Sequence, residues 1–357
     1  MSNEQFDEQQ AEAFAGRMVG ILNEGALAHL VSIGHQTGLF DTLSLLPPAT
    51  SGQVAEAAGL NERYVREWLN GLTVGQIVAY NPENRTYRLP PEHAAFLTRA
   101  AGADNLAVYS QHVSQLGAVE SGIVNCFHNG GGVPYESFHR FHEIMAEDSY
   151  LNVVSVLAGQ ILPLAPGLPE RLAAGIRVLD IGCGRGHALC EMARHFPNSE
   201  FVGYDLSEEA IAFAREEAAE QGLENARFAV KDVTFLDEVQ AYDLITAFDA
   251  IHDQGFPGRV LGNIHTALRP DGVFLMQDIA ASSHVHNNGD HLLGPFLYTI
   301  STMHCMTVSL AQGGAGLGTM WGRETAERML AEAGFENVDR QQLPHDIFND
   351  YYVCRPA

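Results

Sequence analysis

The spacing of hydrophobic residues changes about halfway along the chain. Beyond residue 175, short apolar runs alternate with amphipathic segments, which is the pattern of β-strands alternating with α-helices. We expect strands at 176–181, 200–205, 226–232, 242–249 and 273–279 and helices at 187–195, 207–221, 258–268 and 323–333. This alternation predicts a doubly wound parallel sheet of the α/β class. Two further strands, around 336–343 and 348–355, are joined by too few residues for a parallel crossover, so they should pair antiparallel and complete a seven-stranded sheet.

The first hundred residues are mainly helical. The segment 51–61 has the pattern of an N-capped helix, a glycine turn and a second N-cap at Asn61, which opens a helix over 61–70. Residues 77–80 and 86–89 flank a turn and are expected to form a two-stranded wing, so this part of the chain predicts a winged helix. The helical stretch before it carries more apolar residues than a lone small domain needs, namely Leu22, Ala26, Leu30, Ile33 and Leu39. We therefore expect a homodimer.

These patterns divide the chain into three regions. Residues 1–100 form the winged-helix region. Residues 101–170 form a helical connector, which is interrupted by a glycine-rich turn at 130–134 and ends in a proline-rich segment at 163–169. Residues 171–357 form the α/β domain.

The charge of the chain limits its partners. Its 44 acidic and 20 basic residues give a formal net charge of −24, which argues against a nucleic-acid partner. Residues 1–100 contain six Arg and no Lys against eleven acids, so a cofactor-sensing transcription regulator is the less favoured alternative. The sequence shows neither a signal peptide nor an apolar run approaching the ~18 residues that cross a bilayer, so we expect a cytoplasmic protein without membrane contact. The five cysteines, which lack a CxxC spacing, are expected to be reduced thiols.

One motif carries the chemistry of the α/β domain. The run Val178-Leu-Asp180-Ile-Gly182-Cys-Gly184-Arg-Gly186 closes the first strand and opens a helix. Further acids follow at the ends of the next strands, at Asp205 and Asp232, and the fourth strand runs through Phe248 into His252-Asp253. Because the carboxyl ends of parallel strands meet in one crevice, we expect these groups to converge. The alternative is an NAD-binding domain, but its Gly-x-Gly-x-x-Gly fingerprint differs from this motif, and three acids suit a sulfonium cation better than a pyrophosphate.

With this motif, residues 176–355 resemble the class I S-adenosylmethionine-dependent methyltransferases, which have a Rossmann-like sheet. The resemblance implies that the loop from Gly182 through Gly184 to Gly186 approaches the methionine part of the cofactor and that Asp180 belongs to its hydrogen-bond network. It also implies that Asp205 holds the ribose hydroxyls. The remaining residues expected to border the cofactor are Leu206, Asp232, Val233 and Phe248.

The arrangement of the whole chain resembles the small-molecule O-methyltransferases of plants and bacteria, which join a winged-helix dimerisation domain to this catalytic fold. In those enzymes a His-Asp-Trp tripeptide after the fourth strand supplies a general base. Here the tripeptide is His252-Asp253-Gln254. We expect His252 to be the base, oriented by Asp253, with a hydroxyl as the favoured acceptor. A histidine that only packs on the cofactor remains the alternative, as does methyl transfer to the sulfur of a thiol or the nitrogen of an amine.

The segment from Ala280 to Gly322 is a long insertion whose glycines, Gly313 to Gly318, suggest a mobile or tightly turned cover. Its aromatic, methionine and histidine residues are expected to line an apolar acceptor pocket, together with residues of the connector. The candidates for acceptor binding are Tyr135, Phe138, His291, Tyr298, His304 and Trp321. His284, His286 and His291 lack the spacing and acidic context of a known ligand set, so we expect no metal.

Overall fold

The computed structural model describes residues 6–356, which fall into two compact units, one ending at Ser114 and the other beginning at Gln115. The division lies within helix α6 (Ser110–Gly117), so the expected connector, 101–170, is shared between the units. Each unit is described by itself. Among the described residues no single helix is long and apolar enough to cross a membrane, although Phe141–Leu164 and Leu168–Ala174, bent by 109°, meet that test together.

The first unit is the expected winged helix. Its helices are α1 (Glu8–Gln36), α2 (Leu39–Leu45), α3 (Ser51–Ala58), α4 (Glu62–Val74) and α5 (Pro91–Leu97), and β1 (Ala79–Asn81) pairs antiparallel with β2 (Thr86–Arg88) as the wing. Asn61 caps α4 as expected, whereas α3 is capped one residue earlier than expected, by Thr50, in a reciprocal capping box with Gln53. The core centres on Phe40, Trp68, Leu69 and Leu72.

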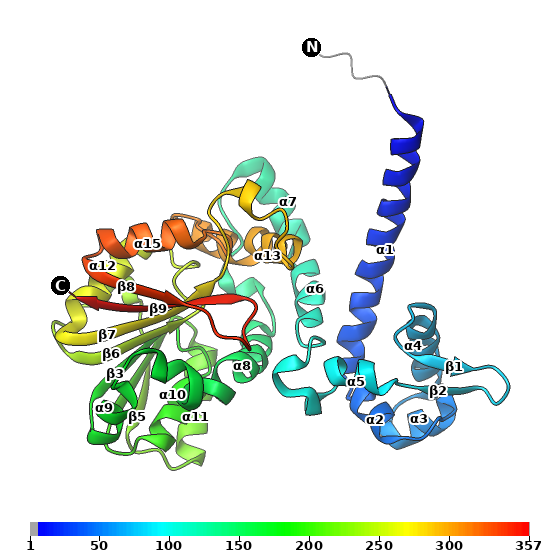
Figure 1. Cartoon of the computed structure of the whole chain (residues 1–357), viewed down its shortest axis with the longest axis horizontal. Helices are drawn as coiled ribbons and strands as arrows, with labels where there is room; N and C mark the ends of the chain where they lie inside the picture. Colours follow the sequence, from blue (N-terminus) through cyan, green and yellow to red (C-terminus); the bar gives the residue numbers. More distant parts are fainter. Residues whose placement is uncertain (1–5, 357) are drawn as a thin grey trace. The chain divides into compact units, whose positions relative to one another are not determined.

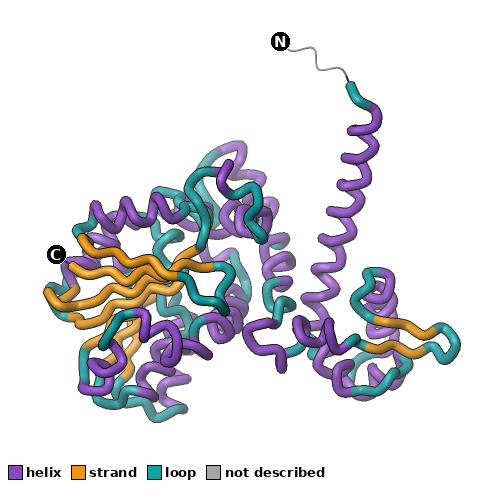
Figure 2. The backbone as a smooth tube through the Cα atoms, viewed as in Figure 1, coloured by secondary structure: helices purple, strands orange, loops and turns teal. Residues whose placement is uncertain are grey.

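The second unit contains the seven-stranded sheet (Figure 2). Its strands are β3 (Arg177–Ile181), β4 (Glu200–Asp205), β5 (Ala226–Val230), β6 (Tyr242–Phe248), β7 (Leu268–Ile279), β8 (Phe335–Gln341) and β9 (Asn349–Pro356). Their order is β5-β4-β3-β6-β7-β9-β8, and β9 runs antiparallel to both of its neighbours while β3 to β7 are parallel. The expectation of an antiparallel last strand is confirmed. β7 begins earlier than expected, at Leu268, because that residue already pairs with Tyr242 before the register shifts.

Helices cover both faces of this sheet (Figure 1). α9 (Leu168–Ala174), α10 (His187–His195) and α11 (Glu208–Glu220) contribute to one apolar core, and α12 (Pro257–Ala267) and α15 (Arg323–Glu332) contribute to the other. Val178 and Leu179 of β3 point into opposite cores and are both fully buried. This burial on two faces explains why the central strands read as continuous apolar runs.

Two segments that are distant in sequence pack together in the second unit. One contains α7 (Glu120–Asn129), the short helix η2 (Tyr135–Ser137) and α8 (Phe141–Asn152). The other is the insertion, with α13 (Gly294–Ile300), a π-helical turn η8 (Ser301–Cys305) and α14 (Met306–Ala311). Ile123, Phe138 and Val308 share a buried cluster, and the N–H of Val133 donates to Oγ1 of Thr307 at 2.7 Å. The connector and the insertion therefore form one layer.

Candidate active site

The glycine loop between β3 and α10 is tightly built. Gly182, Gly184 and Gly186 all have positive φ, which favours glycine. A Cβ atom at Gly182 would lie 2.5 Å from Cβ of Ala250, whereas a Cβ at Gly184 would meet no described atom within 4 Å. Gly182 is therefore required by packing, and Gly184 borders open space where a ligand can approach the backbone.

The N–H groups of this loop are already used inside the protein. Gly182 and Cys183 donate to the carbonyl of Tyr204 at 2.8 and 3.2 Å, and Gly184 donates to Oδ2 of Asp205 at 2.9 Å. A phosphate cradle needs such donors to point at the ligand. The loop therefore fits a cofactor without phosphates better than a dinucleotide.

Three acids surround the loop. Asp180 is buried beneath it and accepts a hydrogen bond from Oγ1 of Thr246 at 2.7 Å. Burial raises the pKa of Asp180 to about 7, with Thr246 opposing the shift and Asp205 adding to it. Asp205, at the end of β4, also accepts from the N–H of Ser207 at 2.8 Å, and Asp232 accepts from the N–H of Thr234 at 2.8 Å. The expected cofactor acids thus all lie at carboxyl ends of neighbouring strands.

The other residues expected at the cofactor differ in exposure. Leu206 is half-exposed just beyond β4, where a planar group can reach it. Val233, in contrast, is buried in the core cluster beside α12, and Phe248 packs against the opposite core. Side-chain contact of these last two residues with a ligand stays a prediction.

His252 is held by a residue that the sequence did not single out. Its ring is 3% exposed, and Nδ1 donates to Oδ1 of Asp278, the penultimate residue of β7, at 2.8 Å. The expected partner, Asp253, forms no hydrogen bond with the ring among the described residues and instead lies near the phenol of Tyr135. The residue that contacts the ring is therefore Asp278 and not Asp253, and the catalytic roles of His252 and Asp253 stay a prediction. An acid at the end of the fifth strand was visible in the sequence, and the strand-end argument used for Asp205 and Asp232 would have found it.

Burial and neighbouring titratable groups shift the pKa values of His252, Asp253 and Asp249. Burial disfavours the charged imidazole, but Asp278 and Cys305 outweigh it and hold the pKa of His252 well above its usual range. Burial raises the pKa of Asp253 to about 6, with His252 opposing the shift. Burial and Asp278 also raise the pKa of Asp249 well above that of an ordinary aspartate. Acids held near neutrality beside a histidine are typical of catalytic centres.

The ligand atoms of Asp249, His252 and Asp278 lie within 4.8 Å of one another, close enough for one metal ion. The nitrogen and oxygen that face each other are, however, joined by the Nδ1–H···Oδ1 hydrogen bond. A metal would have to displace that proton. The expectation of a metal-free site therefore stays a prediction.

Half of the acceptor-binding candidates lie together. The ring of His304 stacks on Phe141 with centroids 4.0 Å apart, and it meets Phe138 and Tyr135 edge-on at 4.5 and 5.2 Å. Because Tyr135 lies near Asp253, this aromatic cluster borders the strand ends that carry His252 and Asp253. The cluster gives the site an apolar wall.

The other three candidates have structural partners elsewhere. Nε2 of His291 lies 3.1 Å from the carbonyl of Ala280, and the hydroxyl of Tyr298 accepts from Nδ2 of Asn288 at 3.2 Å. Trp321 is buried, and its Nε1 donates to Oδ1 of Asp278 at 2.8 Å. The structure therefore does not bring these three side chains into the aromatic cluster.

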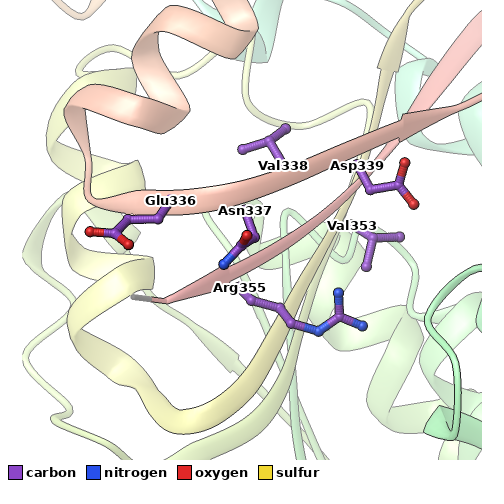
Figure 3. Close-up of a pocket in the computed structure, with 6 residues that line it drawn as sticks. All are labelled: Glu336, Asn337, Val338, Asp339, Val353 and Arg355. Atoms are coloured by element: carbon purple, nitrogen blue, oxygen red, sulfur yellow. The ribbon is translucent and has the colours of Figure 1, made fainter.

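A depression on the outer strands lies apart from these groups. It is lined by Glu336, Asn337, Val338, Asp339, Val353 and Arg355 of β8 and β9 (Figure 3). None of the candidate groups lines it, so it does not compete with the strand-end site.

Two family models match this chain. Residues 25–99 match a model described as an Rv2258c-like winged HTH domain, and residues 172–341 match one described as a methyltransferase domain. Malonyl-(acyl-carrier protein) O-methyltransferase of Bacillus cereus is 31% identical over 130 residues, which cover 36% of this chain and 46% of that protein. Trans-aconitate 2-methyltransferase of Variovorax paradoxus is 36% identical over 121 residues, which cover 34% and 43%. The chain thus spans less than half the length of these relatives.

Solved structures match over nearly the whole chain. Human N-acetylserotonin methyltransferase in complex with S-adenosylmethionine superposes with a TM-score of 0.67 at 15% identity, covering 100% of this chain and 99% of that one. Mitomycin 7-O-methyltransferase superposes with a TM-score of 0.68 at 17% identity, covering 97% and 99%. At these identities the likeness shows the fold. Together with the two family models it shows that this chain joins a winged helix-turn-helix domain to a methyltransferase domain with the fold of small-molecule O-methyltransferases.

Proposed function

We propose that this protein transfers a methyl group from S-adenosylmethionine to a hydroxyl of a small molecule. The observation that carries the proposal is the His252–Asp278 pair at the carboxyl ends of β6 and β7, beside the glycine loop and next to the aromatic cluster. The names of the two relatives, both methyltransferases, support the same reaction class.

The residues around the loop suit this cofactor. Its sulfonium carries the electrophilic methyl group, and its positive charge would be favoured near Asp180, Asp205 and Asp253. Gly184 would let the cofactor lie against the backbone, and the oxygens of Asp205 would accept from the ribose hydroxyls, since each retains a lone pair beside its backbone donor. We infer that Leu206 and Asp232 border the adenine.

His252 would take the proton of the acceptor hydroxyl as the oxygen attacks the methyl carbon. With Nδ1 bonded to Asp278, Nε2 is the nitrogen that would take the proton, and Asp278 would stabilise the imidazolium that forms. The raised pKa means that this histidine holds its proton more tightly than a histidine in water does. A cationic cofactor next to the ring would lower that pKa and favour the basic form.

The test is a labelled-methyl screen with S-adenosylmethionine against pools of hydroxyl, thiol and amine acceptors. We expect label in the hydroxyl pool, and a loss of at least about a hundredfold in turnover for His252→Ala with cofactor affinity nearly kept. His291→Ala is the matched control, because that histidine contacts a backbone carbonyl in the insertion. Transfer to a thiol, with a loss in His252→Ala that shrinks as the pH rises, would instead support an S-methyltransferase.

We also propose that the winged-helix domain serves dimerisation and not DNA binding. The helix α1 exposes a row of large apolar side chains, Phe14, Met18, Val19, Ile21 and Leu22. On α4, in the recognition position, Arg63 and Arg66 are paired with Glu67 and Glu62, which leaves little attraction for phosphates. Sedimentation of Leu22→Glu, expected to be monomeric, and a low-salt DNA shift assay, expected to be negative, test the two halves of this proposal.

A further inference from the structure

The carboxylate that orients His252 is itself fixed by the insertion. Oδ1 of Asp278 accepts three hydrogen bonds, each of 2.8 Å, from Nδ1 of His252, from the N–H of Ile279 and from the indole Nε1 of Trp321. Oδ2 is buried and has no hydrogen-bond partner among the described residues. The indole and the N–H of Ile279 therefore both donate to the oxygen that faces the imidazole, and together they hold the carboxylate in this orientation.

The same insertion holds the main chain that carries His252. Oγ of Ser309 donates to the carbonyl of Gln254 at 2.8 Å, and the N–H of Ala315 donates to the carbonyl of Gly255 at 2.8 Å. The N–H of Gly318 donates to the carbonyl of His252 at 3.2 Å. A Cβ at Gly314 would lie 2.4 Å from the carbonyl oxygen of Gly255, so the glycines permit this close wrapping. The glycine-rich segment is thus the tightly turned alternative of the two that the sequence suggested.

We infer that Trp321 is a positioning residue, which holds Asp278 and through it His252 in the orientation for proton transfer. Trp321 was expected to line the acceptor pocket, but its side chain is buried and donates to Asp278, which supports the role of a positioning residue instead. The inference rests on the proposed function only in giving His252 the role of base. The geometry itself, with three donors on Oδ1 of Asp278, is independent of the identity of the acceptor.

Removal of the indole N–H has a predictable direction. The charged or titratable groups that face His252 are Asp278 on β7, Cys305 on η8, and Asp249 and Asp253 on its own loop. In Trp321→Phe the N–H of Ile279 still holds the carboxylate of Asp278, which has one donor fewer and therefore interacts more strongly with the imidazolium. The imidazolium should therefore hold its proton more tightly in Trp321→Phe.

The first measurement uses the unmodified protein and needs no acceptor. The chain has two tryptophans, so its ¹⁵N–¹H spectrum has two indole signals. Nε1 of Trp68 donates to the carbonyl of Leu30, which does not titrate, so its signal is an internal control. We expect the Trp321 signal to move with pH at the midpoint of His252 and to lose that movement in His252→Gln. A Trp321 signal that ignores the titration of His252 would overturn the inference.

The second measurement follows the Cε1–H signal of His252, assigned with His252→Gln. In Trp321→Phe its midpoint should rise by about half a unit to one unit, while in Trp68→Phe it should stay where it is. A midpoint unchanged within about 0.2 units in a folded Trp321→Phe would leave Trp321 a packing residue. If that variant does not fold, the indole titration of the unmodified protein still decides. Methyl transfer retained by His252→Ala would refute the proposed role of His252 as the base. It would leave unaffected the inference that Trp321 is linked to His252 through Asp278.

Discussion

Asp205 connects the glycine loop to the start of α11, so its substitution should lower both the stability of the protein and its affinity for the cofactor. Its Oδ2 accepts the N–H of Gly184 in the glycine loop, and its Oδ1 accepts the N–H of Ser207 at the start of α11. A hydrogen bond to a charged group contributes about 1.5–3 kcal/mol. Because both donors are half-exposed and water can replace the carboxylate, we take about 1.5 kcal/mol each. Asp205→Ala should then lower the free energy of unfolding of the cofactor-free protein by about 3 kcal/mol.

The cost to binding comes on top of this. If both ribose hydroxyls lose their acceptor, at about 1 kcal/mol each, the Kd for S-adenosylmethionine should rise about 30-fold. Asp205→Asn keeps one oxygen but places an NH₂ group against the other donor, so it should show about half of each effect. Glu208→Ala, an exposed acid of the same helix turn, is the control and should change stability by less than about 0.5 kcal/mol.

Two assays separate the contributions. Thermal unfolding without cofactor should show a Tm lower by about 6–12 °C for Asp205→Ala, from about 2–4 °C per kcal/mol in a domain of this size. Calorimetric titration with S-adenosylmethionine below that temperature gives the affinity. A Tm within about 2 °C of the unmodified protein would show that Asp205 does not hold the loop. An affinity loss below about threefold would place the ribose elsewhere.

Three shorter predictions follow. Gly186→Ala should lower the free energy of unfolding by about 2–4 kcal/mol in denaturant titration, because φ is +79° and the new Cβ would lie 2.6 Å from Cε1 of Phe228. Gly222→Ala, with φ +67° but open space, should lose only about 1 kcal/mol, and equal losses would contradict this account. The value of kcat/KM for S-adenosylmethionine, which reports the protein before the cofactor binds, should fall as the pH drops through the raised pKa of His252, giving an acid limb above pH ~6.5. A limb at or below that value refutes the ion-pair argument. EDTA should change turnover less than about twofold, since a proton already joins His252 to Asp278, and a larger loss restored by a divalent metal would identify a metal enzyme.

The parallel, helix-covered sheet was predictable because each central strand is buried on two faces. Apolar runs such as that of β3 leave few other interpretations, and the short connection before β9 excludes a parallel crossover. The acids at the strand ends were predictable for the same reason, since parallel strands bring their carboxyl ends to one edge. The order and direction of the strands are therefore enough to bring these acids together.

Side-chain direction within loops was not predictable. Asp253 is next to His252 in sequence yet lies near Tyr135 and not against the imidazole ring, because consecutive residues of a turn point in different directions. Asp278 lies 26 residues away and reaches the ring through strand pairing of β6 with β7. Trp321 and His291 share the insertion with His304, but the pattern of apolar residues does not tell which of them turns toward the sheet and which toward the aromatic cluster.

The glycine loop has a consequence for the thermodynamics of ligand capture. Its amides are bonded to Tyr204 and Asp205 of the protein itself, so its conformational entropy is lost when the protein folds and not when the cofactor arrives. Binding to such a rigid surface carries little ordering cost, and the heat-capacity change should reflect the area that the cofactor covers and not the folding of a segment. Fast association without a slow rearrangement phase is the kinetic counterpart of this preorganisation.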